Sequence, residues 1–208
     1  MKLKIQISPG NIKTGRIPAI SLPPIMSCPK NAPCARWKEC YALRMYKQYK
    51  ETKAAWDRNL KIYNQDPLDY FNQIKAYLLK KKPPFFRWHV SGDIPDKEYL
   101  RLVRKLCRET PEIKHLLFTK RYSYNYRNLP KNFTVIFSLW TNYGPSKSRM
   151  PKAWMFDPKN PDPRIPKNAL QCPGNCETCG LCWHLKNLKN KNVVFPKHGY
   201  GVPFKHGD

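Results

Sequence analysis

The sequence predicts an α/β protein, either a partial (β/α) barrel or an open parallel sheet, with a cysteine-rich C-terminal extension. Apolar runs of strand length, rich in aromatic and β-branched residues, cover residues 85–90, 115–119 and 133–139. Segments with apolar residues at helical spacing lie at 68–80 and 96–108. Strands that alternate with helices favour parallel pairing, because each helix carries the chain back to the start of the next strand.

The remaining elements follow from the same patterns. Residues 1–7 alternate polar and apolar side chains, which predicts a strand that ends at the turn 8–10. Residues 41–63 have the pattern of one long helix, and residues 193–195 that of a last short strand. Asp96 stands directly before a helical segment, where an N-cap is expected.

Proline suggests how the chain is divided. The stretch 145–173 is rich in proline, which lacks a backbone donor and resists helix formation, so we expect a linker there. We therefore expect an α/β core in residues 1–145, which includes an N-terminal loop with three cysteines. Residues 146–208 would then hold the linker and a second cysteine group, packed on the core.

The chain is strongly basic, with 39 Lys and Arg against 14 Asp and Glu and a formal net charge of +25. Such an excess repels itself, and a polyanionic partner such as DNA or RNA is the usual compensation. Solubility, or adaptation to a salty cytosol, would also explain the charge.

The sequence points to a reducing compartment. No apolar run approaches the roughly 20 residues that a membrane helix needs, so we expect no membrane partner. The N-terminus lacks the pattern of a secretory signal, and we expect a cytoplasmic protein. Thiols stay reduced in that compartment, where clustered cysteines are metal ligands more often than disulfides.

Four cysteines crowd into a short segment near the C-terminus: Cys172, Cys176, Cys179 and Cys182. Their spacing resembles the way ferredoxins bind a [4Fe-4S] cluster, in which short spacers let successive thiolates reach different irons. A four-cysteine zinc site is the main alternative, although zinc ligands usually come as two pairs about a dozen or more residues apart. The spacing therefore favours an iron–sulfur cluster.

Three more cysteines, Cys28, Cys34 and Cys40, are followed by Tyr41. Three thiolates would leave one iron of a cluster without a protein ligand, and an open position of that kind can bind a substrate or cofactor. Alternatively, these are separate buried cysteines, or one of them joins the C-terminal group. Cys107 lies on an apolar helical face, and we expect a core residue there.

Polar or aromatic residues stand at the ends of three of the predicted strands, where parallel α/β folds carry their functional sites. At the first strand end stand His89, Ser91 and Asp93, at the second Thr119, Lys120 and Arg121, and at the third Ser138, Trp140 and Asn142. Plain alternatives exist: a core histidine, a carboxylate that caps the next helix, and a solvated basic edge. Their recurrence at successive strand ends nevertheless predicts a site.

Basic residues also alternate with tyrosines over residues 120–127, a composition that suits unpaired nucleic acid. Ordinary surface with buried tyrosine rings is an equally good interpretation. The sequence contains no Walker loop, no Gly-x-Gly-x-x-Gly, no His-Glu-x-x-His and no Gly-x-Ser-x-Gly motif. Hydrolysis by an activated serine and nucleotide binding at a glycine-rich turn therefore have no sequence support.

The order of these motifs resembles that of radical S-adenosylmethionine enzymes. Those enzymes place three cluster cysteines in the loop after the first strand, often with an aromatic residue beside the last one, as Tyr41 is beside Cys40. They place a glycine-rich acidic motif after the second strand, where Ser91, Gly92 and Asp93 stand here. The cysteine spacing here is longer than the Cys-x3-Cys-x2-Cys of that superfamily.

A closer resemblance, over most of residues 8–198, is to the phage-type gene product 88-like family. It shares a Cys-Pro opening at 28–29, a Cys-Tyr-Ala turn at 40–42 and a Phe-Thr-Lys strand end at 118–120. It also shares a His-x-Ser-Gly-Asp strand end at 89–93 and a Cys-Gly-Leu-Cys-Trp segment at 179–183. The resemblance implies an iron–sulfur protein related to the radical enzymes, but it brings no biochemical activity with it.

Together the cysteine motifs and these resemblances predict one or two [4Fe-4S] clusters and an enzyme like the radical S-adenosylmethionine enzymes, and the basic charge suggests a nucleic acid or nucleotide-like substrate. Ser91, Gly92, Asp93 and Tyr41 would contact S-adenosylmethionine, and His89, Asp93 and Lys120 would serve catalysis. A ferredoxin or flavodoxin would supply electrons. The alternative is a non-catalytic iron–sulfur protein that binds nucleic acid and uses its clusters as structural or redox-sensing elements.

Overall fold

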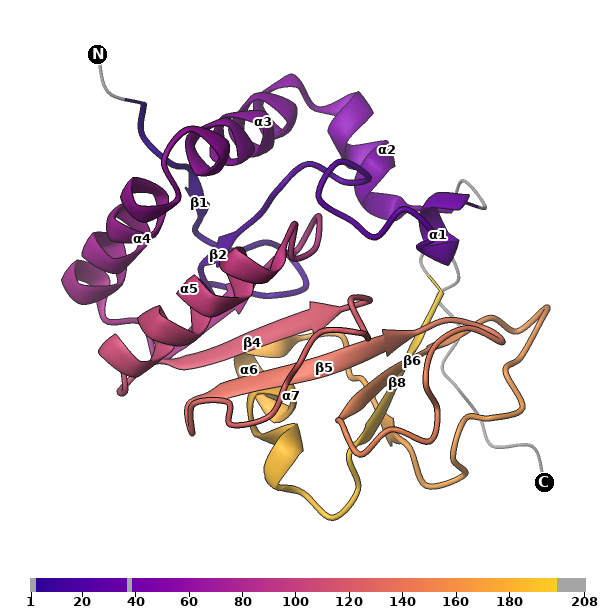
Figure 1. Cartoon of the computed structure of the whole chain (residues 1–208). Coiled ribbons are helices and arrows are strands. Elements are labelled where there is room, and N and C mark those ends of the chain that lie inside the picture. Colours follow the sequence, from indigo (N-terminus) through magenta and orange to yellow (C-terminus); the bar gives the residue numbers. More distant parts are fainter. Residues whose placement is uncertain (1–2, 37–38, 198–208) are drawn as a thin grey trace.

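The computed structural model describes residues 3–36 and 39–197. Eight strands form one open sheet in the order β1-β2-β3-β4-β5-β6-β8-β7, and every neighbouring pair except β1–β2 is parallel (Figure 1). The expected α/β class is confirmed, in its open form. The strands are β1 Ile7–Ser8, β2 Ala19–Ile20, β3 Phe85–Trp88, β4 Lys114–Thr119, β5 Phe133–Leu139, β6 Lys152–Phe156, β7 Leu170–Gln171 and β8 Asn192–Pro196.

The helices within the described residues are α1 Pro33–Arg36, α2 Tyr41–Gln48, α3 Lys50–Gln65, α4 Pro67–Lys81, α5 Lys97–Glu109, α6 Cys176–Cys179 and α7 Leu181–His184, with a 3-10 turn at Leu185–Asn187. Two of them start at aspartate caps. Asp66 accepts a hydrogen bond from the Asp69 amide at 2.9 Å, and Asp96 accepts one from the Tyr99 amide at 2.8 Å. These caps fix the starts of α4 and α5, and the Asp96 cap is the one that the sequence predicts. None of the described helices is long and apolar enough to cross a lipid bilayer.

The sheet is covered on both faces. Helices α3, α4 and α5 pack on the first face, where Phe86 and Trp88 of β3 are fully buried. The second face carries a smaller apolar cluster under α7, centred on Trp183 and Ile136. Because side chains alternate along a strand, Arg87 points to the second face, opposite Phe86 and Trp88.

Three expectations from the sequence are wrong in detail. Residues 3–6 are not a strand, because the amides of Ile5 and Gln6 donate to the side chains of Gln73 and Asn59 rather than to another strand. The helix expected over 41–63 is two helices, broken at Tyr49, whose φ of −112° and ψ of 109° are extended.

The proline-rich stretch 145–173 contains the buried strand β6 rather than only a linker. Proline precedes β6 at Pro151 and is absent inside it, so the strand keeps its hydrogen bonds to β5 and β8. Lys152 makes the strand hard to recognise in the sequence, because a lysine is not expected in a buried strand. Here its buried ammonium group donates hydrogen bonds to the carbonyls of Ser148 and Met150. The division of the chain near residue 145 stays a prediction.

Candidate functional site

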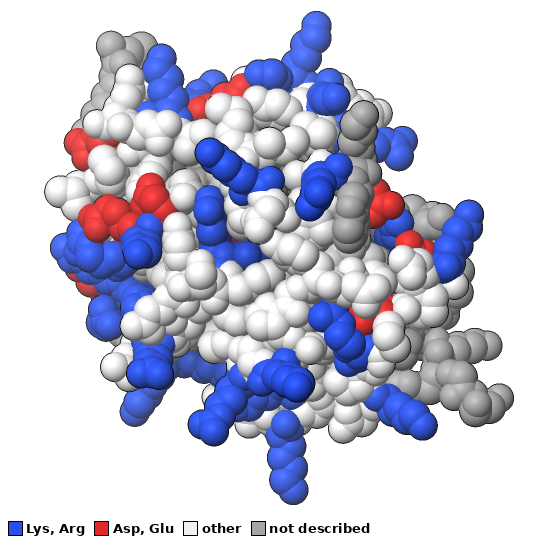
Figure 2. All heavy atoms as spheres, turned by 45° about the vertical axis from the view of Figure 1, so that its right-hand side comes forward, with Lys and Arg blue, Asp and Glu red and all other residues white. Residues whose placement is uncertain are grey.

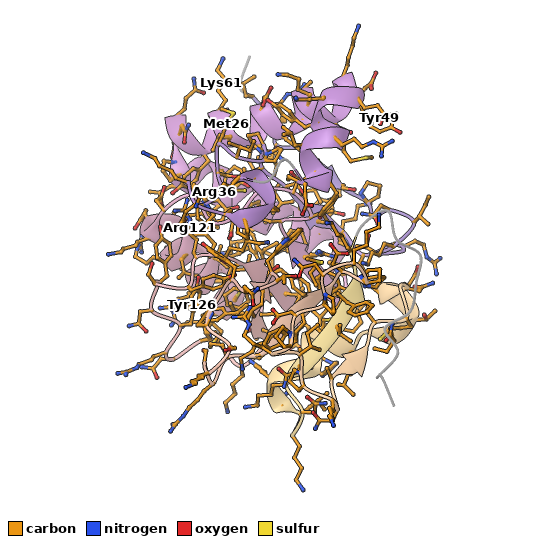
Figure 3. The ribbon with its side chains drawn as sticks, turned by 90° about the vertical axis from the view of Figure 1, so that its right-hand side faces the viewer. Met26, Arg36, Tyr49, Lys61, Arg121 and Tyr126 are labelled. Carbon is orange, nitrogen blue, oxygen red and sulfur yellow. The ribbon has the colours of Figure 1, made fainter. Side chains whose placement is uncertain are left out.

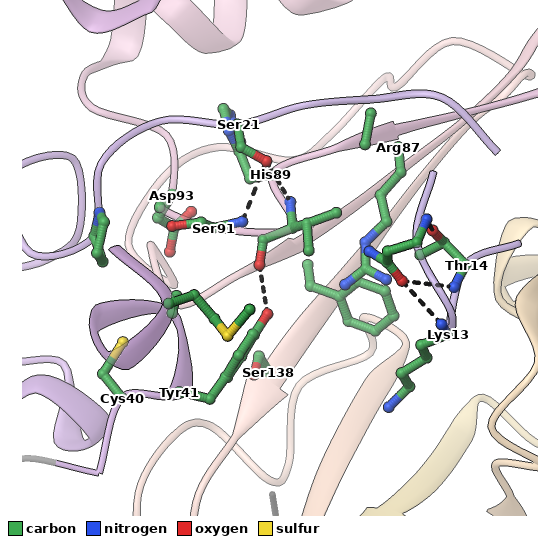
Figure 4. A pocket seen from close by; sticks show the side chains of 18 of the residues that line it. Lys13, Thr14, Ser21, Cys40, Tyr41, Arg87, His89, Ser91, Asp93 and Ser138 are labelled. Carbon is green, nitrogen blue, oxygen red and sulfur yellow. Dashed lines mark hydrogen bonds between the residues drawn. The ribbon is translucent and has the colours of Figure 1, made fainter. Parts of the chain in front are cut away.

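The first cysteine loop rests on the turn of residues 89–93, which follows β3. The Leu22 amide donates to the Ser91 carbonyl at 3.1 Å, and Ser21 Oγ accepts from the Val90 amide at 3.2 Å (Figure 4). Ser27 Oγ, next to Cys28, accepts from the Asp93 amide at 3.3 Å. These contacts bring the start of the Cys28–Cys40 loop beside the Ser-Gly-Asp turn.

Gly92 allows this contact. Its φ is +80°, and a Cβ added there would lie 2.4 Å from Ser27 Oγ and 2.8 Å from the Leu22 carbonyl oxygen. Only glycine tolerates both the left-handed backbone and the close approach. The position of Gly92 is thus explained by backbone packing between the loop and the turn.

Asp93 ties two strand ends together. Its carboxylate accepts hydrogen bonds from the Ile94 amide at 2.7 Å, the Thr119 hydroxyl at 2.7 Å and the Lys120 amide at 2.8 Å. Burial raises the pKa of this carboxyl, and the three hydrogen bonds oppose that rise. Asp93 does not cap α5, because Asp96 has that role.

Lys120 and Arg121 diverge after β4. The Lys120 ammonium donates to Ser138 Oγ at 3.1 Å and lies 5.7 Å from the centre of the Trp140 ring, on the cavity side. Arg121, which is labelled in Figure 3, instead donates to the carbonyls of Ile94 and Pro95, at 2.8 and 3.1 Å, and to that of Ser27. Arg121 therefore clamps the cysteine loop to the segment before α5.

His89 and Ser91 are buried polar residues whose side chains have no hydrogen-bond partner within the described part of the chain. The His89 ring packs against Tyr99, with centroids 5.3 Å apart, and its φ of +60° ends β3. Burial lowers the pKa of His89 to about 3, so the ring is neutral near pH 7. Ser91 is 2% exposed, and its hydroxyl lies at the edge of the cavity without a hydrogen-bond partner among the described residues.

The thiols of the first loop influence one another. The Cys40 thiol donates a hydrogen bond to Cys34, which lowers the pKa of Cys34 to about 6 and raises that of Cys40. Burial, and then the nearby Asp93 charge, raise the pKa of Cys28 to about 11. Tyr41 donates its hydroxyl to the Val90 carbonyl and so links this loop to the turn after β3.

The second cysteine group lies under the second face of the sheet. Cys172 directly follows β7, Cys176 begins α6 and Cys182 belongs to α7. Burial raises the pKa of Cys182 to about 12 and also raises that of Cys176. Cys179 belongs to the same segment but is exposed.

The N-terminal turn holds this second group in place. The Cys176 amide donates to the Lys13 carbonyl at 2.9 Å, and Arg16 pairs with Glu177 at 2.7 Å. Residues at the two ends of the described chain are thus brought together beside the sheet.

A cavity of about 800 Å³ joins the two cysteine groups. Its lining includes thiols from both: Cys28, Cys34, Cys40, Cys172, Cys176 and Cys182. The second face supplies one wall, where Phe118, Ser138 and Phe195 follow the apolar cluster beneath α7. Tyr41, Ser91, Asp93 and Lys120 also line this cavity. Its size and its largely apolar wall suit a small-molecule site.

Sequence reasoning missed two cations that line this cavity, Arg87 and Lys13. A signal for Arg87 was present, because it is the one charged residue in the otherwise aromatic strand Phe85–Trp88. Lys13 carries no such signal, since it lies in an exposed turn and reaches the cavity only through the fold.

The cysteines are all unpaired: none of the eight forms a disulfide, and Cys107 is a fully buried core residue, as expected. Within residues 3–36 and 39–197, no three His, Cys, Asp or Glu side chains converge closely enough to hold a single metal ion. The thiols instead border the open space of the cavity.

The tyrosines expected to stack on nucleic acid are packed into the protein. Tyr122 donates its hydroxyl to the Ser138 carbonyl, and Tyr126, which is 8% exposed, donates to the Arg121 carbonyl. Both rings also contact Phe137. For Tyr122 and Tyr126, the interpretation as surface with buried tyrosine rings is therefore the correct one.

Comparison with known proteins identifies a family. A family model described as gene product 88 matches residues 2–185, which is most of the chain and includes the first cysteine loop, the turn after β3 and all four C-terminal cysteines. No curated protein and no solved structure matches the chain. The chain belongs to the gene product 88 family.

Proposed function

We propose that this chain is an iron–sulfur protein, with one [4Fe-4S] cluster held by Cys28, Cys34 and Cys40. A second would be held by the group Cys172, Cys176, Cys179 and Cys182. The observation that carries the proposal is the meeting of both cysteine groups at one cavity, although more than 130 residues separate them along the chain. Thiolates are the usual protein ligands of such clusters.

The thiols fit this role chemically. All seven are free, and six of them border open space rather than a packed core. Cys34 is poised to be a thiolate, because Cys40 donates to it and Lys120 lies nearby. A bound cluster would supply electron transfer, and the first group would leave one iron open to a small molecule.

We further propose an enzyme that resembles the radical S-adenosylmethionine enzymes and acts on a nucleic acid or nucleotide-like substrate. The free Ser91 hydroxyl and the backbone around Gly92 would orient the cofactor, and Asp93 would keep that turn in place. Lys120 would hold an anionic part of the substrate beside the first cysteine group. The apolar wall would exclude water. A cytoplasmic ferredoxin or flavodoxin is the reductant that this chemistry requires.

An S-adenosylmethionine titration tests the enzymatic proposal. Protein reconstituted without air is reduced and followed by electron paramagnetic resonance, and we expect the spectrum to change as the ligand is added. Ser91→Ala should weaken the titration, while Ser123→Ala, an exposed serine in the turn after β4, should not. A spectrum that S-adenosylmethionine leaves unaltered would count against the enzyme.

A second candidate is a non-catalytic iron–sulfur protein that binds nucleic acid. The observation in its favour is the surface, where Lys and Arg side chains are spread over the visible face and acidic groups are few (Figure 2). Binding of this kind weakens steeply with salt, because each phosphate contact releases a counterion. Affinity for an RNA or DNA oligomer that is absent, or that does not change with salt, would exclude it.

A further inference from the structure

Arg87 is a cation with no acidic partner among residues 3–36 and 39–197. It extends from β3 toward the cavity, and its guanidinium stacks 5.0 Å from the centre of the Phe118 ring. Within the described residues it forms no salt bridge, and its buried Nε has no hydrogen-bond partner. Removing a charged donor from water is costly unless a partner replaces the lost hydration.

The position of Arg87 relates it to both cysteine groups. Its charge opposes the rise in the pKa of Cys176 and Cys182 that burial causes. The same charge opposes the rise that burial causes in the pKa of Tyr41, the neighbour of Cys40. Figure 4 shows Arg87 with Tyr41 on one side and the turn of Lys13 and Thr14 on the other.

Three acidic residues line the cavity; two of them have partners elsewhere, and the third, Glu51, is exposed. Glu39 pairs with Lys197 at 2.7 Å, and Asp93 accepts three hydrogen bonds from the strand ends. Lys13 and Lys120 add further positive charge to the lining. Acids and cations in the lining are therefore equal in number, but Glu39 and Asp93 are already engaged. The cavity thus combines an aromatic and apolar wall with a cation, Arg87, that has no acidic partner within the described residues.

We propose that this cavity binds a small organic anion, and that Arg87 holds its carboxylate or phosphate group between the two cysteine groups. Guanidinium forms two parallel hydrogen bonds to such a group, which gives both affinity and orientation. The proposal rests on the proposed function for the role of the cavity, and it names the class of ligand that the cavity takes.

Calorimetric titration of the full chain, prepared without air and at fixed ionic strength, tests this inference. The probes are inorganic phosphate, adenosine monophosphate and succinate, with adenosine as the uncharged comparison. We expect saturable binding of at least one anion, and a loss of at least about tenfold in Arg87→Met. Methionine keeps the apolar contact with Phe118, and Arg87→Gln is a second uncharged variant in case the first does not fold.

Arg101→Met is the matched control. Arg101 is 59% exposed, pairs with Glu98 and lies outside the cavity, so its loss removes one charge but no ligand contact. Wild-type protein that binds none of the anions would overturn the inference, as would equal binding by folded Arg87 variants or an equal loss in Arg101→Met. Phosphate binding without succinate binding identifies a phosphate ligand, and the reverse a carboxylate.

Iron and sulfide are counted in every sample to separate the two proposals. Anion binding that depends on Arg87 in protein without iron would sustain this inference and refute the cluster. Iron-loaded protein that binds no anion would sustain the cluster and refute the inference.

Discussion

The two cysteine groups border one cavity, but different forces hold them. The first group lies on a loop fixed by polar contacts: Tyr41 to the Val90 carbonyl, Ser27 to the Asp93 amide, and the close approach at Gly92. The second group lies on two short helices anchored by apolar packing, with Trp183 buried at 3% exposure under the sheet.

The difference extends to the backbone. Ile25 and His89, both beside the first group, adopt positive φ values of 69° and 60°, which cost free energy for residues with a Cβ. In the second group the positive φ values fall on Gly174 and Gly180, where they cost little. Strain that surrounding structure maintains is typical of binding sites, and relaxed packing is typical of anchors. We therefore propose that the first group carries the chemistry and that the second supports it.

The largest effect should follow from removing the anchor. Trp183→Ala deletes a buried ring and its hydrogen bond to the Phe86 carbonyl, and we expect the free energy of unfolding to fall by about 3–5 kcal/mol. Urea unfolding followed by circular dichroism measures it. Leu79→Ala, at a position that is 50% exposed, is the control. A loss below about 1 kcal/mol for Trp183→Ala would contradict the role of apolar packing.

A smaller effect should come from the polar region. Gly92→Ala forces a Cβ against Ser27 Oγ and the Leu22 carbonyl at a φ of +80°, and we expect a loss of about 2–3 kcal/mol. Gly174→Ala has a similar φ of +85° with no atom within 4 Å, so it should cost only about 1 kcal/mol. Equal losses in the two variants would show that the contact between loop and turn is not tight.

Acid should test the two buried histidines, of which His89 lies beside the first cysteine group and His115 packs on Trp88. Burial lowers the pKa of His89 and of His115 to about 3, whereas an unfolded histidine titrates near about 6.5. The unfolded state therefore binds more protons between those values, and stability falls as the pH is lowered. Each histidine contributes about 1.4 kcal/mol per pH unit within that window.

His89→Asn separates the two histidines, because asparagine tolerates a positive φ and does not titrate. Stability measured by urea unfolding at several pH values should then lose about half of this histidine-dependent slope. The remaining half belongs to His115, whose ring nitrogens contact Trp88 and Thr110. An unchanged slope would mean that His89 is protonated in the folded protein.

The smallest effect should come from Tyr41→Phe, which removes the hydroxyl that donates to the Val90 carbonyl. We expect a loss of about 1 kcal/mol and faster hydrogen exchange in the turn 89–93. Tyr49→Phe, on an exposed tyrosine between α2 and α3, should change neither. Unaltered exchange in Tyr41→Phe would show that the hydrogen bond from Tyr41 to Val90 does not stabilise the turn.

Patterns local in sequence were the ones that could be predicted. Asp96 and the apolar spacing after it fixed α5, and the run Phe133–Leu139 was a strand as expected. Elements that depend on distant partners were missed. Strand β6 is stabilised by pairing with β5 and β8, and the extended backbone at Tyr49 has no local breaker such as proline or glycine.

The site shows the same division. The two cysteine groups and the Ser-Gly-Asp turn were visible as motifs, but their meeting at one cavity depends on the order of strands in the sheet. Arg121, which the sequence places beside Lys120, uses its guanidinium on backbone carbonyls. The sequence pattern does not distinguish Lys120 from Arg121. Their different roles depend on the carbonyl groups that the fold places within reach of Arg121.

Iron and acid-labile sulfide per chain, measured on protein purified without air, test the central claim most directly. Two clusters predict about eight irons and as many sulfides, and a single cluster about four. Variants that lack either cysteine group should each lose about half of the iron if there are two clusters. A colourless protein that contains stoichiometric zinc, or disulfides after strictly anoxic handling, would contradict the account.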